Sequence, residues 1–188
     1  MLIKLLPEPE KPLLLDLAEL LALSDNPVLW DGKKYDELTS DTDLSNLSIQ
    51  IDEQESELLA DLEHSAGHPS RRESGWLSTS VKNRLVEQLK TFALSKVELL
   101  ESRIAASQAV LAQLLEGRST DRPEVPKIML FEMFLVALRD GSISSIEQKL
   151  LRAFQHHYQI EDFIFDDLLE RAEALNDEVS KTIALVLE

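Results

Sequence analysis

Two carboxylates flank a short polar segment in the carboxyl-terminal half of the chain. Asp140 is followed by Gly141, and Glu147 comes a few residues later. This order matches the second half of an EF-hand calcium loop, in which an acid, a glycine, an apolar residue and a final acid follow one another. Val136 and Leu138 occupy the positions that need oxygen ligands in the first half. We therefore favour a capped turn between two helices, and keep a weak calcium or magnesium site at Asp140 and Glu147 as an alternative.

Two further groups have the residue types of a metal site. Asp41 and Asp43 alternate with other oxygen-bearing side chains, but the required glycine and the bidentate glutamate are missing, so turn chemistry explains them. His64 and His68 have the spacing of metal ligands on a helix. Gly67 lies between them and opposes a regular helix there. Neither group predicts a metal centre.

An acidic stripe is the other group of residues with a candidate role. It lies on the predicted helix that follows residue 160 and consists of Asp162, Asp166, Asp167, Glu170 and Glu173. A solvated helix face explains it. The alternative is a docking surface for a basic protein partner. No cysteine, activated nucleophile or phosphate-binding loop accompanies it, so we expect no enzymatic activity.

The charge of the chain limits its partners. The formal net charge is −16, and residues 1–80 contribute 17 acidic and 6 basic side chains, a net of −11. Such a surface repels nucleic acid and anionic membranes. The longest apolar stretch, residues 128–138, is too short to cross a bilayer. We therefore expect a soluble cytoplasmic protein with no nucleic-acid partner and no membrane insertion, and the absence of cysteine fits a reducing compartment.

Abundant leucine and scarce aromatic residues favour helices over a β-sandwich. Prolines predict an extended lead-in over residues 1–12, and residues 24–51 predict a long loop with short helical turns. Residues 128–138 are almost all apolar and predict a buried central helix. Apolar periodicity predicts helices over residues 12–23, 52–64, 127–139, 144–158, 161–175 and 177–187.

Residues 80–116 keep helical apolar spacing without a proline or glycine. One helix of this length would extend roughly 55 Å, longer than a compact domain of this size is wide. It therefore breaks, near residues 95–96 or 107–108, or it projects and finds a partner. The second alternative implies a homodimer through residues 80–116.

Residues 125–175 resemble the TerB-like helical family, which is linked to tellurite resistance. The resemblance lies in a buried helix that ends in an Asp-Gly turn at Asp140, a second helix, and an acidic helix after Ile160. It extends back to about residue 78 and implies an all-α helical bundle over residues 76–188. Residues 1–75 are not covered by the resemblance, and their composition predicts an acidic extension of helices and loops. The resemblance also implies a divalent-metal site near the Asp-Gly turns. Only Asp140 and Glu147 match that site, because the second candidate turn, at Asp31, lacks the apolar residue after its glycine.

These observations lead to two functional hypotheses. The first is a non-enzymatic protein-interaction or scaffold module in a bacterial stress-response or defence system. The second is a regulatory protein that binds a divalent metal at Asp140 and Glu147. A hydrolase is disfavoured because the sequence supplies no activated nucleophile.

Overall fold

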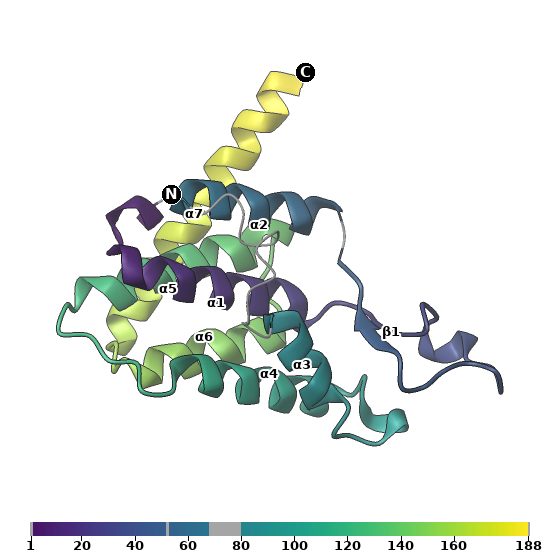
Figure 1. Cartoon of the computed structure of the whole chain (residues 1–188). Coiled ribbons are helices and arrows are strands. Elements are labelled where there is room, and N and C mark those ends of the chain that lie inside the picture. Colours follow the sequence, from purple (N-terminus) through teal and green to yellow (C-terminus); the bar gives the residue numbers. More distant parts are fainter. Residues whose placement is uncertain (1, 52, 68–79, 188) are drawn as a thin grey trace.

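The computed structural model describes residues 2–51, 53–67 and 80–187. These residues form an all-α bundle with one small two-stranded sheet (Figure 1). The seven α-helices within them are α1 (Lys11–Ser24), α2 (Glu53–Ala66), α3 (Val81–Leu89), α4 (Leu100–Leu115), α5 (Glu124–Ala137), α6 (Ser145–His157) and α7 (Asp162–Leu187). The all-α fold class predicted from the sequence is confirmed.

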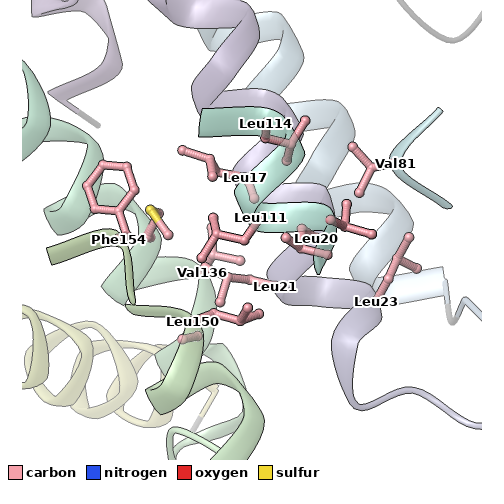
Figure 2. Packing of buried hydrophobic residues seen from close by; sticks show 14 of the residues in the cluster. Leu17, Leu20, Leu21, Leu23, Val81, Leu111, Leu114, Val136, Leu150 and Phe154 are labelled. Carbon is pink, nitrogen blue, oxygen red and sulfur yellow. The ribbon is translucent and has the colours of Figure 1, made fainter. Parts of the chain in front are cut away.

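Helix α1 lies at the centre of the core. It contacts α2, α3, α4, α5 and α6, and most of its leucines are buried. Figure 2 shows Leu17, Leu20 and Leu21 of α1 facing side chains of α4 and α6, among them Leu111 and Leu150. Burying a leucine contributes about 2 kcal/mol. Helices from both sides of the predicted boundary at residue 75 therefore share one hydrophobic core. The boundary itself lies outside the described residues.

Helix α5 is buried along most of its length, as its apolar sequence predicts. Its one acid in the middle, Glu132, is also buried and accepts hydrogen bonds from the backbone N–H groups of Leu2 and Ile3. The extended lead-in predicted for residues 1–12 is wrong. The segment forms two 3-10 helices, η1 (Leu2–Leu5) and η2 (Glu8–Glu10), because Glu132 binds the free N–H groups at the start of η1.

Of the two alternatives for residues 80–116, a break or a projecting helix, the structure shows the break. A short 3-10 helix, η4 (Leu94–Lys96), lies between α3 and α4, which confirms the break expected near residues 95–96. Both pieces turn their apolar stripes inward, and α3 and α4 pack on each other and on α1. The apolar stripe of residues 80–116 is therefore covered by other helices of the same chain. The homodimer through residues 80–116 stays a prediction, and the fold does not support it.

A buried arginine fastens α4 to the end of α1. Arg103 donates from Nη2 to the carbonyl oxygens of Ser24 and Asn26, each at 2.7 Å, and from Nε to Ser24 at 3.1 Å. The last carbonyls of a helix have no partner within the helix. The Arg103 guanidinium supplies that partner at the carboxyl end of α1, and burial lowers its pKa.

Residues 24–51 contain a sheet that the sequence did not predict. Strand β1 (Val28–Trp30) pairs antiparallel with β2 (Leu47–Ile49), and Trp30 lies opposite Leu47. A 3-10 helix, η3 (Tyr35–Glu37), lies between them. Asp31 and the glycine after it adopt φ values of 52° and 76°, the geometry of a tight hairpin turn. The second Asp-Gly pair therefore belongs to a β-turn.

Helix α7 is one continuous element, where the sequence predicted two. Figure 1 shows its carboxyl-terminal part extending beyond the bundle. No proline or glycine interrupts residues 162–187, so the backbone hydrogen bonds continue past the last contact with the core. Within the part of the chain that the structure describes, no helix combines the length and the apolar character needed to cross a bilayer.

Candidate functional site

The Asp-Gly corner joins α5 to α6. After α5, a 3-10 helix, η5 (Leu138–Asp140), tightens the last turn, and Gly141 follows with φ of 86°. This left-handed conformation favours glycine because it has no Cβ. The N–H of Gly141 donates to the Leu138 carbonyl at 2.9 Å, and Asn176 of α7 donates to the same oxygen at 3.0 Å. The corner is therefore fixed by its own turn and by a side chain from α7.

The capped turn expected between the two helices is observed, and its cap is a capping box at the start of α6. The Glu147 carboxylate accepts a hydrogen bond from the Ser144 N–H at 2.7 Å, and the Ser144 hydroxyl accepts one from the Glu147 N–H at 3.3 Å. Each side chain thus satisfies a backbone donor that the helix leaves free. This role follows from the Ser-x-x-Glu spacing alone.

The environment of Glu147 could not be read from that spacing. Only 7% of the residue is exposed, and burial raises the pKa of its carboxyl group to about 7. The hydrogen bonds from Ser144 lower this pKa, while the negative charges of Asp25 and Asp140 raise it further. Desolvation prevails because the charged form loses more hydration than two hydrogen bonds restore. Glu147 is consequently a carboxyl group that titrates near neutral pH.

The two predicted metal ligands have different surroundings. Asp140 is exposed, whereas Glu147 is buried and occupied by the Ser144 N–H. Within residues 2–51, 53–67 and 80–187, no group of three or more His, Cys, Asp and Glu side chains could hold a metal ion. Calcium takes six to eight oxygen ligands. A site at Asp140 and Glu147 would need most of its ligands from water, and it stays a prediction.

The two other groups considered as metal sites have local explanations or lie outside the described residues. Asp43 accepts hydrogen bonds from the N–H and the hydroxyl of Ser45, at 2.9 and 2.6 Å, and these bonds lower its pKa. This is the turn chemistry expected for the segment. His64 lies at the end of α2, and His68 lies outside the described residues.

The acidic stripe lies on the exposed side of α7. Its five members, Asp162, Asp166, Asp167, Glu170 and Glu173, are all exposed. Arg152 of α6 forms ion pairs with Asp162 at 3.5 Å and Asp166 at 3.2 Å, and Arg171 pairs with Asp167 at 3.0 Å. The two cations offset part of the negative charge at the amino end of the stripe. Glu170 and Glu173, which form no salt bridge with the described residues, carry charge that a partner can reach.

A cavity of about 440 Å³ lies between the Asp-Gly corner, α6 and α7. Its apolar lining includes Phe134, Leu138 and Phe165, and its polar lining includes Arg152 and Glu173. The volume falls within the range of ligand pockets. The structure therefore brings one residue of the acidic stripe, Glu173, into the lining of a cavity with both polar and apolar walls beside the predicted turn.

Two residues that the sequence did not single out organise this region. The Arg152 guanidinium lies 3.7 Å from the centre of the Phe165 ring, a cation–π contact. Gln155 is buried and donates to the Ile160 carbonyl at 3.0 Å and to Asp162 at 2.9 Å. Both contacts connect α6 to α7 across a turn. No periodicity marks them, because each depends on the angle at which the two helices meet.

Comparison of the chain with protein-family models, curated proteins and solved structures found no match. The resemblance to the TerB-like family therefore stays a prediction from the sequence motif.

Proposed function

We propose that this chain is a non-enzymatic protein-interaction module that binds a basic partner through the acidic side chains of α7. The observation that carries the proposal is the exposure of all five acids of the stripe on one helix. Carboxylates in water attract a basic surface over roughly a Debye length, about 8 Å at physiological salt. Following the TerB-like resemblance, the setting would be a bacterial stress-response or defence system.

The cavity beside the Asp-Gly corner also favours partner binding at the acidic side of α7. Its apolar lining suits an aliphatic or aromatic side chain of the partner, and Glu173 at its edge suits a lysine or arginine next to that side chain. Charge would then steer the encounter, and the buried side chain would slow dissociation. Phosphate-bearing partners are disfavoured by the same carboxylates.

A capture experiment with matched charge variants tests the proposal. The full chain is immobilised, a bacterial lysate is passed over it at low and at high salt, and the retained proteins are compared. We expect a basic protein that is retained at low salt, released at high salt, and lost with the double variant Glu170→Lys and Glu173→Lys.

The control places the same charge change on another exposed helix face, with Glu57→Lys and Asp61→Lys on α2. We expect this control to retain the partner as the natural chain does. Equal loss with both double variants would mean that net charge matters and the α7 surface does not, and it would refute the proposal.

A further inference from the structure

The apolar face of α7 continues beyond the bundle. Its members recur every three or four residues and therefore lie on one side of the helix: Leu168, Ala172, Leu175, Val179, Ile183 and Val186. Ala172 is fully buried against the core, whereas Leu175, Val179 and Ile183 are 45%, 49% and 54% exposed. Leu185, Val186 and Leu187, at the far end, are exposed still more. We call the residues from Leu175 to Leu187 the distal α7 segment.

The distal α7 segment begins at an apolar groove. The groove has a volume of about 610 Å³ and lies between α5, α7 and η1. Its apolar lining includes Ile128, Phe131, Leu168 and Leu175. Leu175 belongs both to the groove and to the distal segment. One apolar surface therefore runs from the groove outward along α7. The chain thus exposes both aliphatic side chains and a groove that can receive such side chains.

The acidic side chains of α7 lie away from this surface, and Arg171, which lines the groove, is paired with Asp167. Asp166, Glu170 and Glu173 lie on the side of α7 opposite the apolar face, since successive residues turn by about 100°. The distal α7 segment itself carries Asp177, Glu178 and Lys181, so its net charge is small. Two copies can pair through the apolar face while their acidic faces point away from each other.

We infer that two copies of this chain associate by antiparallel pairing of their distal α7 segments. With Val179 of one copy beside Ile183 of the other, Leu175 lies at the level of residues 186 and 187 of the other copy, and Val186 is the one of these two on the apolar face. Val186 of each copy then lies beside Leu175 of the other copy, at the edge of its groove. This arrangement covers the exposed aliphatic residues and the groove together.

The antiparallel direction follows from charge and from the groove. Parallel pairing would place two bundles, each within a chain of net charge −16, side by side at the same end of the helix pair. It would also leave both grooves empty. Antiparallel pairing separates the bundles and gives an isologous interface, the usual form of a symmetric dimer. Because the contact is about three helical turns long, we expect reversible association with a dissociation constant on the order of micromolar.

Sedimentation equilibrium of the full chain tests association, with Val179→Gln and Ile183→Gln as the disrupting variant. Glutamine favours helix at least as well as valine or isoleucine, so α7 stays helical. We expect the natural chain to dimerise and the variant to dissociate at least tenfold more readily. The control, Leu44→Gln and Leu99→Gln, removes two side chains of similar exposure elsewhere and should leave the dimer unchanged. A natural chain that is monomeric at high concentration, or a dimer that survives the α7 substitutions, overturns the inference.

Disulfide trapping tests the direction of pairing, and the chain offers a clean background because it has no cysteine. Leu175→Cys and Val186→Cys are made as separate single variants. Mixed under mild oxidation, they should give a cross-linked dimer, whereas each alone should stay largely monomeric on a non-reducing gel. Efficient cross-linking of Leu175→Cys with itself would indicate parallel pairing and would overturn the proposed arrangement.

Discussion

Replacing the buried carboxyl of Glu147 should change how the stability of the chain depends on pH. In the unfolded chain this carboxyl loses its proton near 4.5, and in the folded chain burial raises its pKa to about 7. Between these values the folded state holds a proton that the unfolded state has released. A rise in pH across this window therefore favours unfolding. The contribution of the protonated Glu147 carboxyl to the unfolding free energy is complete below pH 4.5 and is lost as the pH rises past 7.

The size of the effect follows from the shift. One pKa unit corresponds to about 1.4 kcal/mol, so a shift of this size corresponds to about 3 kcal/mol. Glu147→Gln removes the charge and keeps an oxygen that can accept the Ser144 N–H. Between pH 4 and pH 8, the unfolding free energy of Glu147→Gln should therefore rise by about 3 kcal/mol relative to that of the natural chain.

Urea unfolding followed by circular dichroism, repeated across this pH range, measures that difference. Using the difference cancels the pH dependence that arises from the other carboxylates of a chain with net charge −16. Glu147→Ala serves as a control, because it also removes the cap and should cost about 1 kcal/mol relative to Glu147→Gln at every pH. Parallel stability curves for Glu147→Gln and the natural chain would refute the reasoning, since they would mean that Glu147 titrates alike in both states.

Four further predictions follow from particular contacts. Gly141→Ala places a Cβ in a left-handed conformation and should lower the unfolding free energy by about 1 kcal/mol in urea titrations, with Gly141→Asn losing less. Arg103→Met leaves the carbonyls at the end of α1 without donors and should cost about 3 kcal/mol, part of which Arg103→Lys restores. Glu132→Leu removes the acceptor of the Ile3 N–H, so hydrogen exchange of residues 2–6 should accelerate, whereas Glu132→Gln should change it less. Calorimetry with calcium, magnesium, manganese and zinc tests the metal hypothesis: heat that is lost in Asp140→Ala supports it, and no heat with any of these ions ends it.

The local features of the Asp-Gly corner could be predicted from the sequence. The capping box of Ser144 and Glu147, the turn at Gly141 and the burial of α5 each depend on residues within a few positions of one another. Such features follow from helical periodicity and from backbone groups that need a nearby partner. The break near residues 95–96 could also be predicted, because a single helix over residues 80–116 would have been longer than the domain is wide.

Only the tertiary structure determined which groups the buried charged side chains contact. Arg103 caps a helix whose end lies 77 to 80 residues earlier in the chain, and Glu132 binds a backbone N–H 129 residues away. The pKa of Glu147 depends on burial and on Asp25, which α1 brings close only when the core has formed. A sequence pattern encodes the faces that elements bury. It does not encode which distant backbone group each buried charge will meet, because that is set by the angles and offsets at which the helices pack.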